Sequence, residues 1–358
     1  MKVAVDYQSV SGKPTGIGVF TKNLIEAIRR QAPDIEFVLY QPDRDRDLRA
    51  LERIWWESMT IPFRSLRDKP QLVYSPGFSP AIFSPFPCVV TVNDLIGLTF
   101  PGNQGLASSF YWRRWLPAAL KRAKCLVAIS EATKKDMVHY LGIPADRIPV
   151  VPDFVHPRFQ KMENNSTIIP TLRKYPIREP YFICVGSLEP RKNLVRLIEA
   201  YDRLRRDKKN GFTLAIAGKG AAAEGDVRRL VRERGLEEHI SFLGYVPEED
   251  LAALYNGALG YVTVSLYEGF GLPALEAMQC GKSGVSSNRS SLPEVTGDTA
   301  LLVDPEDTRQ IAEALHRFAA DAPLREELGR KARERAKMFS AEKAADQMIR
   351  IFRNACAK

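Results

Sequence analysis

Short apolar runs alternate with longer helical patterns from one end of the sequence to the other, and this alternation constrains the fold more than any other feature. The apolar runs have the length and the β-branched composition of buried strands, and the stretches between them are long enough for helices. Strands separated in this way form parallel sheets with helices on their faces. We therefore predict an α/β fold with strands at 3–6, 36–40, 72–75, 89–92, 126–129, 148–151, 181–185, 212–217, 242–246, 259–264 and 300–303.

The chain of 358 residues is long enough for two domains of ordinary size, and 45% of its residues are hydrophobic, which suits packed cores. A polar, proline-containing stretch at 161–180 is typical of an interdomain linker. We expect an N-terminal domain at 1–165 and a second α/β domain at 166–340.

The net charge of +9 indicates an anionic partner, and a nucleotide, an anionic membrane face or a nucleic acid would satisfy it. The sequence has no basic–aromatic sheet motif and no recognition helix, so we expect no nucleic-acid partner. It has no apolar run long enough to span a bilayer, and its N-terminus enters a strand, so we expect a cytoplasmic protein. The five cysteines are scattered, and no close cluster of cysteine and histidine predicts a zinc site.

The stretch Ser265–Gly281 joins a strand to a helix and carries the most specific motif of the sequence. At such a junction the loop lies at the carboxyl end of a parallel strand, where unpaired helix amides face an anion. Gly269 and Gly271 allow the backbone to approach a phosphate closely. Glu268 and Glu276 flank the glycines, and an acidic pair beside a phosphate suits the hydroxyl groups of a sugar or a ribose. The element predicts a nucleotide-sugar site; the alternative is a surface helix with two solvated glutamates.

A second motif lies in the first strand-to-helix loop of the second domain, where Gly186-Ser-Leu-Glu-Pro-Arg-Lys-Asn193 follows the predicted strand at 181–185. A basic pair at this place can neutralise a diphosphate at the carboxyl edge of the sheet. Cations at the start of a helix oppose the helix dipole unless an anion lies between them. Arg191 and Lys192 are therefore candidates for anion binding, in preference to two solvated surface cations.

Three weaker patterns lie in the first domain. Gly16 and Gly18 form a glycine pair after the first strand but lack the third glycine of the dinucleotide fingerprint, so ligand approach and a plain helix start both explain them. The run at 43–47 has the Asp-x-Asp spacing of some metal sites, but its interleaved arginines favour a solvated loop. Asn93 and Asp94 follow the fourth predicted strand.

The two glutamates with Gly-Phe-Gly-Leu-Pro between them, together with the Gly…Arg-Lys-Asn loop, resemble the signature of the retaining glycosyltransferases of family four. The resemblance implies the GT-B architecture, in which two Rossmann-like domains face each other across a cleft. It implies that Glu268 contacts the donor sugar and Glu276 the ribose, with Arg191, Lys192 and Glu268 as the catalytic set. It assigns further donor contacts to the loop at Gly186 and to the backbone of Phe270, Gly271 and Leu272.

The resemblance also implies roles outside the two motifs. Gly16 and Gly18 would face the donor phosphates, and Tyr245 and Val246 would contact the base through backbone atoms. The last helix, within 341–358, would cross back and pack on the N-terminal domain. Fixed cations and amides would stabilise the leaving group, so we expect neither a metal ion nor a cofactor.

One position departs from the family pattern. Asn93 stands where the family has histidine, and an amide cannot titrate near neutral pH. Asp94 would bind an acceptor hydroxyl, orient the loop or cap the next segment, and the sequence leaves these three open. The motif around Asn288 is similar to that of bacterial polysaccharide mannosyltransferases, which favours GDP-mannose as donor and a glycan or lipid-linked glycan as acceptor.

The helical stretch at 104–124 places Trp112 and Trp115 beside several cations. Aromatic and basic side chains together suit an anionic membrane interface; the alternative is a helix that faces the core and keeps its arginines in solvent. We therefore predict a metal-independent retaining glycosyltransferase with peripheral membrane contact in this region. The alternatives are a sugar-nucleotide epimerase of the same fold, which would need acid–base groups that the four histidines do not provide, and a basic nucleic-acid-binding protein.

Overall fold

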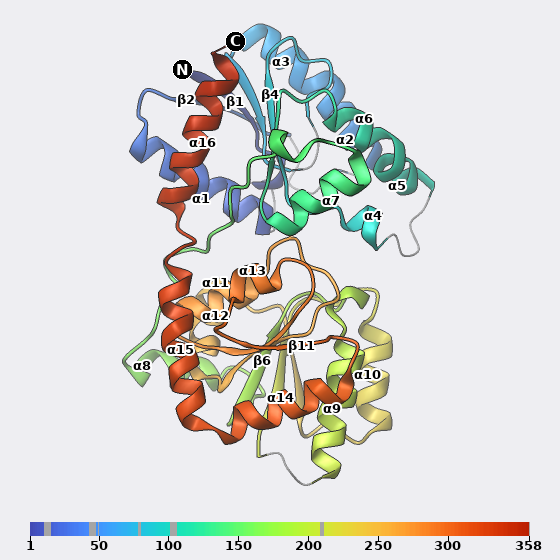
Figure 1. Cartoon of the computed structure of the whole chain (residues 1–358), viewed down its shortest axis with the longest axis vertical. Helices are drawn as coiled ribbons and strands as arrows, with labels where there is room; N and C mark the ends of the chain where they lie inside the picture. Colours follow the sequence, from blue (N-terminus) through green and yellow to red (C-terminus); the bar gives the residue numbers. More distant parts are fainter. Residues whose placement is uncertain are drawn as a thin grey trace. The chain divides into compact units, whose positions relative to one another are not determined.

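The computed structural model describes residues 1–10, 16–42, 48, 50–77, 80–100, 106–207 and 211–357. The charged run at 43–47 lies outside these ranges. The chain divides into two compact units, one formed by residues 1–154 with 339–358 and the other by residues 155–338 (Figure 1). The division therefore falls earlier than the expected boundary at 165, and the C-terminal helix belongs to the first unit.

The sheet of the first unit, within the described residues, is parallel with the order β2-β1-β3-β4-β5. Its strands lie within one residue of five predicted ones: β1 (Lys2–Asp6), β2 (Glu36–Tyr40), β3 (Leu72–Ser75), β4 (Cys88–Val92) and β5 (Cys125–Ala128). The sixth prediction, at 148–151, was wrong, because this segment contributes only an isolated bridge between Ala128 and Val150. The helices are α1 (Gly16–Gln31), α2 (Ala50–Trp55), α3 (Ile61–Asp68), α4 (Ile96–Thr99), α5 (Leu106–Phe110), α6 (Leu116–Leu120), α7 (Glu131–Leu141) and α16 (Ala341–Cys356).

The C-terminal helix α16 completes the core of the first unit. It packs along α1, and Phe352 is fully buried with its ring centroid 5.1 Å from that of Tyr74 on β3. Helices α1 and α16 lie side by side in Figure 1. The resemblance predicted this return of the last helix, and the structure confirms it.

Two π-helical turns, Trp56–Thr60 and Tyr111–Trp115, join α2 to α3 and α5 to α6 without a break. Each is followed at the second residue by a proline, Pro62 or Pro117. Proline lacks an N–H group and clashes with the preceding turn of a regular helix, and a wider turn relieves that clash.

The two tryptophans that suggested a membrane contact pack inward. Trp112 and Trp115 lie against the apolar core between the sheet and α6, and a Cβ atom on Gly97 would lie 2.1 Å from the Trp112 ring. Phe110, Arg113 and Arg114, on either side of the buried Tyr111 and the partly buried Trp112, are exposed, and so are Lys121, Arg122 and Lys124 further along the stretch. No helix within the described ranges is long and apolar enough to cross a bilayer.

The second unit, over its described residues, also contains a parallel sheet, with the order β11-β10-β9-β6-β7-β8. Its strands are β6 (Tyr181–Val185), β7 (Thr213–Ala217), β8 (Ile240–Gly244), β9 (Gly260–Thr263), β10 (Gly284–Ser287) and β11 (Leu301–Val303). The sequence did not predict β10. The helices are α8 (Asn165–Leu172), α9 (Leu194–Arg206), α10 (Glu224–Glu233), α11 (Glu248–Gly257), α12 (Leu272–Gln279), α13 (Leu292–Thr296), α14 (Thr308–Ala320) and α15 (Ala322–Ala336).

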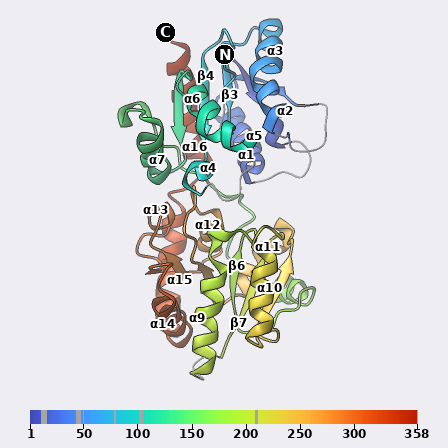
Figure 2. The same cartoon turned by 90° about the vertical axis from the view of Figure 1, so that its right-hand side faces the viewer.

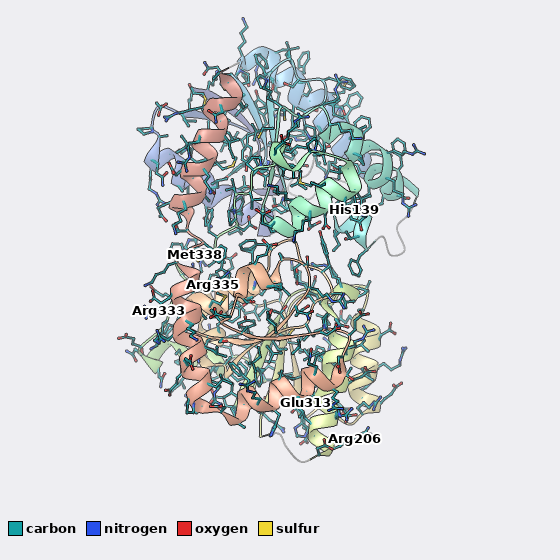
Figure 3. The ribbon with its side chains drawn as sticks, viewed as in Figure 1. His139, Arg206, Glu313, Arg333, Arg335 and Met338 are labelled. Carbon is teal, nitrogen blue, oxygen red and sulfur yellow. The ribbon has the colours of Figure 1, made fainter. Side chains whose placement is uncertain are left out.

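The segment at 161–180 is not the linker that its composition suggested. It contains α8, which packs on α11, and it belongs to the second unit. At the other end of this unit, α15 is tied to α13 by Arg335, whose guanidinium donates to the carbonyls of Glu294 and Val295 at 2.6 and 2.7 Å (Figure 3).

Each sheet has a point where the chain order reverses: between β1 and β3 in the first unit and between β6 and β9 in the second. The loops that leave the two strands there run in opposite directions across the sheet, at the carboxyl ends of the strands. Figure 2 shows β6 and β7 beneath the loops of the second unit, with α9 and α10 over them. Ligand sites in open α/β sheets lie at such points.

Replacing Phe352 with alanine should lower the free energy of unfolding of the first unit by about 3–5 kcal/mol, the usual cost of removing a buried phenylalanine ring. All four tryptophans of the chain lie in this unit, so urea unfolding followed by tryptophan fluorescence reports on it selectively. Arg350→Ala, on the exposed side of the same helix, is the matched control and should change stability little. Equal effects of the two substitutions would contradict a core role for α16.

Candidate active site

The loop after β6 brings a glycine, two cations and an asparagine together. Gly186 has φ +149°, and a Cβ atom there would lie 2.8 Å from Cε of Lys192, so only glycine lets the lysine lie over the strand end. A 3-10 turn at Pro190–Lys192 then leads to Asn193, whose φ is +59°. The predicted basic pair is therefore held on a short, rigid turn.

Asn193 fastens this loop to two neighbouring loops. Its buried side-chain amide donates to the carbonyls of Val264, after β9, and Pro305, after β11, at 3.0 and 2.6 Å. Asparagine tolerates the left-handed conformation better than most residues because its short polar side chain bonds locally. The asparagine of the Arg-Lys-Asn motif thus positions the cations, a role that the sequence did not assign.

The loop after β9 contributes Glu268, which lies at the centre of the site. Its carboxylate accepts from Lys192 Nζ at 2.5 Å, from Arg191 Nη1 at 2.7 Å and from Ser265 Oγ at 2.7 Å. Arg191 Nε also donates to Glu189 at 2.8 Å. The structure therefore joins the three residues predicted to be catalytic in one ion cluster.

The electrostatics of Glu268 follow from these neighbours. Burial alone would raise the pKa of its carboxyl, but the Lys192 ammonium, the Arg191 guanidinium and the hydrogen bonds from Lys192 and Ser265 outweigh burial and hold the pKa below its usual value. Glu268 is therefore ionised at neutral pH. It neutralises part of the positive charge of Arg191 and Lys192, and the predicted diphosphate would share these two cations with the carboxylate.

Two serines after β10 fix the backbone of the glycine loop. Ser290 Oγ and Ser291 Oγ donate to the carbonyl of Glu268 at 2.6 and 2.9 Å, and Ser291 Oγ also donates to the carbonyl of Phe270 at 2.7 Å. Both serines follow the strand that the sequence missed. The signal that would have found them is the Ser-Ser pair before Leu-Pro-Glu.

Gly271 ends the loop and begins α12. Its φ is +117°, and a Cβ atom there would lie 2.8 Å from Cδ2 of Leu292, so the position requires glycine. The amides of Ala274 and Leu275 already bond to the carbonyl of Gly271, and proline at 273 has no N–H. The amides of Gly271 and Leu272 therefore remain as candidate anion donors at this helix start, and their contact with a diphosphate stays a prediction.

Glu276 lies one turn further along α12 and has the opposite electrostatic character. It is half-buried, and its carboxylate accepts a hydrogen bond from the Tyr255 hydroxyl at 2.8 Å. Burial raises the pKa of Glu276 to about 8, against the effects of the Tyr255 hydrogen bond and the Lys192 charge. At neutral pH this carboxyl is mostly protonated, so it can both donate to and accept from hydroxyl groups.

The loop after β8 holds the two residues predicted to contact the base. Tyr245 is 63% exposed, and Lys219 Nζ lies 5.0 Å from the centre of its ring, whereas Val246 is buried. Nearby, Gly218 packs against the Gly186 backbone so closely that a Cβ atom would lie 1.9 Å from the Gly186 carbonyl oxygen. A base contact at 245–246 stays a prediction.

The residues predicted in the first unit follow two of its strands, β1 and β4. Gly16 and Gly18 lie in the first turn of α1, after β1. Asn93, after β4, is buried, and its amide donates to the carbonyl of Pro76 at 3.0 Å. Asp94 accepts from the amide of Ile96 at 3.0 Å and so supports the start of α4, one of the three roles left open by the sequence. The donor and acceptor roles of these four residues stay predictions.

The described residues contain no group of three or more histidine, cysteine, aspartate or glutamate side chains placed to hold a metal ion. The five cysteines are all free thiols.

The chain is similar to solved glycosyltransferase structures and matches two glycosyltransferase family models. The solved sucrose-phosphate synthase from Thermosynechococcus elongatus matches with a TM-score of 0.80 and 20% identity over 99% of this chain and 98% of that chain. This likeness shows that the chain has the two-unit GT-B fold, in agreement with its two parallel sheets. Two family models match the sequence, Glycosyltransferase Family 4 over residues 14–159 and Glycosyl transferases group 1 over residues 171–335.

Two curated relatives add to this likeness. The chain is 35% identical to O-antigen chain mannosyltransferase B of Escherichia coli over 272 residues, which cover 74% of this chain and 70% of that protein. It is 31% identical to the serotype-specific mannosyltransferase WbdA of Escherichia coli over 76% of this chain, but it spans only 34% of that longer protein. The chain belongs to the family-four, group 1 glycosyltransferases.

Replacing Glu268 with glutamine removes the charge that competes for Lys192 and Arg191, so the affinity for a nucleoside diphosphate should rise several-fold. Calorimetric titration with GDP and UDP measures this. Glu189→Gln is the matched control, since Glu189 pairs with Arg191 alone and is more exposed; its effect should be smaller. Equal diphosphate affinity of the wild type and Glu268→Gln would show that the carboxylate and the ligand do not compete for the two cations.

Proposed function

We propose that this glycosyltransferase moves mannose from GDP-mannose to a glycan or lipid-linked glycan, with retention of configuration and without a metal ion. The observation that carries the proposal is the cation pair Arg191 and Lys192, held by a buried carboxylate at the switch point beside the first-turn amides of α12. The names of the two Escherichia coli relatives, both mannosyltransferases, support mannose as the sugar.

The reaction needs a stabilised leaving group. The bond between the anomeric carbon and the β-phosphate oxygen breaks, and GDP leaves with the electron pair. Lys192, Arg191 and the amides of Gly271 and Leu272 neutralise the charge that develops on the diphosphate, which fixed donors can do without reorganising. A bound metal would supply the same neutralisation, so the cation pair makes it unnecessary.

The sugar and the acceptor complete the reaction. Glu268 keeps the two cations in place and, as an ionised carboxylate, accepts hydrogen bonds from donor-sugar hydroxyls. The acceptor hydroxyl oxygen forms the new bond to the anomeric carbon on the face that the leaving group vacates. Its proton passes to the departing phosphate oxygen, so the protein provides no separate base, and Asn93 at the family's histidine position is compatible with this route.

Substitution of Lys192 with alanine should lower kcat by roughly 10²–10³, the scale for removing one preorganised donor. The assay follows transfer of labelled mannose from GDP-mannose, with UDP-glucose in parallel and with a chelator added. Arg206→Ala, at the other end of the helix that follows the motif, is the control and should keep full activity.

The outcomes separate the parts of the proposal. Transfer from GDP-mannose that survives the chelator and falls in Lys192→Ala supports the donor, the metal independence and the role of the cation pair. Transfer from UDP-glucose alone would refute the donor, and full turnover by Lys192→Ala would refute the role of the cation pair. A β-linked product, identified from the one-bond C1–H1 NMR coupling of the transferred mannose, would refute retention.

Binding of the donor ribose to Glu276 should release a proton. The pKa of this carboxyl is about 8 in the free protein, and two hydroxyl groups that donate to it favour the ionised form and lower that pKa. At pH 7, calorimetric titration with GDP in buffers of different ionisation enthalpy should therefore show release approaching one proton, and affinity should increase as the pH rises towards 8. Glu276→Gln should bind GDP more weakly and release none. Equal proton release by both proteins would contradict the ribose contact.

A further inference from the structure

The continuous helical stretch from α2 through the π-helical turn to α3 carries a row of exposed apolar side chains. Five large apolar residues are between 45% and 77% exposed: Leu51, Trp55, Met59, Phe63 and Leu66. Isolated exposed apolar residues are ordinary, but a contiguous set on one element marks an interaction surface. We call these five residues the apolar stripe.

Helix geometry places the stripe on one face. Successive members are three or four residues apart, and a step of four residues in an α-helix advances about 40° beyond one full turn. A π-helical turn contains more residues than an α-helical turn, so a step of four residues within Trp56–Thr60 rotates the chain by a smaller angle. This reduces the angular offset between successive members in the middle of the stripe. Trp56, Ile61 and Ser65 point the other way and are buried against the first unit.

Basic side chains lie beside the stripe. Helix α5 packs against α2, and the stretch from α5 to Lys124 contains five cations and no carboxylate: Arg113, Arg114, Lys121, Arg122 and Lys124. Arg113 and Arg114 are exposed and form no ion pair with any described residue. Figures 1 and 2 agree in placing α2, α3, α5 and α6 on the same side of the first unit.

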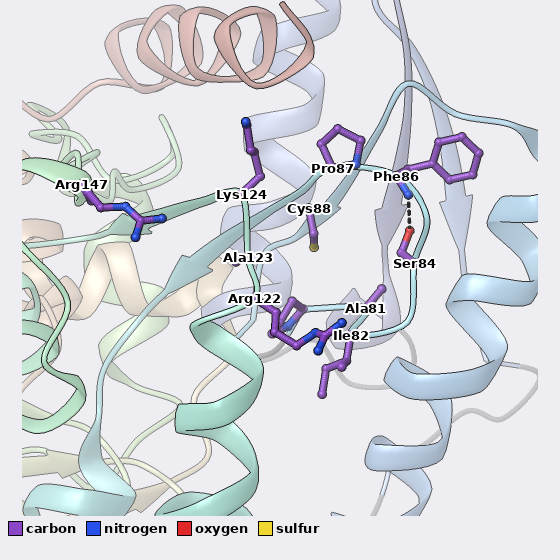
Figure 4. Close-up of a pocket in the computed structure, with 11 residues that line it drawn as sticks. Ala81, Ile82, Ser84, Phe86, Pro87, Cys88, Arg122, Ala123, Lys124 and Arg147 are labelled. Atoms are coloured by element: carbon purple, nitrogen blue, oxygen red, sulfur yellow. Dashed lines mark hydrogen bonds between the residues drawn. The ribbon is translucent and has the colours of Figure 1, made fainter. Parts of the chain in front are cut away.

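A basic pocket lies at the end of this stretch. Its volume is about 330 Å³, and Figure 4 shows Arg122, Lys124 and Arg147 around it, at the amino ends of β4 and β5. No aspartate or glutamate is among its lining residues within the described structure. A pocket with this charge suits a phosphate group.

We infer that this face of the first unit binds an anionic membrane surface. The apolar stripe enters the interface between headgroups and acyl chains, and the cations of 113–124 and Arg147 contact lipid phosphates. A second copy of the chain is a poorer occupant, because symmetric pairing through this face would bring two carboxylate-free basic segments together. An anionic lipid surface would instead attract these basic segments.

The inference deepens the proposed function in one respect, since it places the enzyme where a lipid-linked acceptor would lie; membrane binding itself does not depend on the donor. It also relocates the membrane contact that the sequence suggested. The exposed aromatic side chains of the apolar stripe are Trp55 and Phe63, while Trp112 and Trp115 pack on the core. Phe110, 55% exposed at the end of α5, adds to the same face.

Vesicle flotation tests the surface directly. The full chain is mixed with vesicles of phosphatidylcholine alone or with phosphatidylglycerol added, at low and at physiological salt. The wild type should float with the anionic vesicles, and Trp55→Ser with Phe63→Ser should reduce its partitioning at least about tenfold, because two large apolar side chains no longer leave water. The matched control is Val138→Ser with Tyr140→Ser on α7, the helix of His139 in Figure 3, where both side chains are exposed, though less than Trp55 and Phe63. It should bind as the wild type does.

A charge variant separates the two components of the surface. Arg113→Ala with Arg114→Ala should weaken binding to anionic vesicles roughly tenfold and reduce its salt dependence. Thermal melting and GDP titration on each variant show whether it is folded and binds nucleotide. Lost flotation with unchanged GDP affinity supports the surface; flotation of a wild type that does not bind GDP would refute the donor but not the membrane contact.

Three results would overturn the inference. The first is a wild type that stays with the buffer at low salt in the presence of anionic vesicles. The second is a stripe variant that floats as well as the control. The third is a dimer in lipid-free sedimentation that Trp55→Ser with Phe63→Ser dissociates, which would assign the stripe to self-association.

Discussion

The ion cluster of Glu268, Lys192 and Arg191 is the interaction on which the arrangement of the second unit's site depends. A carboxylate taken out of water is unfavourable unless cations and hydrogen-bond donors surround it, and here two cations and Ser265 do so. Because the partners come from the loops after β6 and β9, satisfying the carboxylate fixes both loops. Removing Glu268 would leave Lys192 without its buried counter-charge, whereas Arg191 would keep Glu189. The cluster is formed in the ligand-free protein, so its geometry is set before a ligand arrives.

The two glutamates of the motif show how one short segment supplies two different chemical groups. Glu268 lies between cations, and its pKa stays below the usual value, whereas burial raises the pKa of Glu276, one turn into α12, to about 8. The first is an anion at neutral pH that holds Arg191 and Lys192 in place. The second is a carboxyl group that is mostly protonated at neutral pH. Only the environment, and not the residue type, separates these roles.

The sequence predicted both sheets and both motifs because each requires a local pattern: a buried parallel strand needs an apolar run, and a close backbone approach needs glycine. It missed β10 because this strand has one large apolar side chain, Val285, between a glycine and two serines. Position 284 must be glycine, since a Cβ atom there would lie 1.9 Å from the carbonyl oxygen of Tyr261. It also mistook the α8 segment for a linker, because Pro170 lies inside that helix. The bonds that Asn193 makes join segments distant in sequence, and no local pattern encodes them.

The central claim is that a diphosphate takes its place beside Glu268 on the same two cations. A crystal structure of the protein with GDP-mannose tests it most directly. The account predicts β-phosphate oxygens within hydrogen-bonding distance of Lys192 Nζ, the Arg191 guanidinium and the amide of Gly271, with the mannose hydroxyls next to the Glu268 carboxylate. A diphosphate bound away from Lys192, with the ion cluster unchanged and out of its reach, would contradict the account.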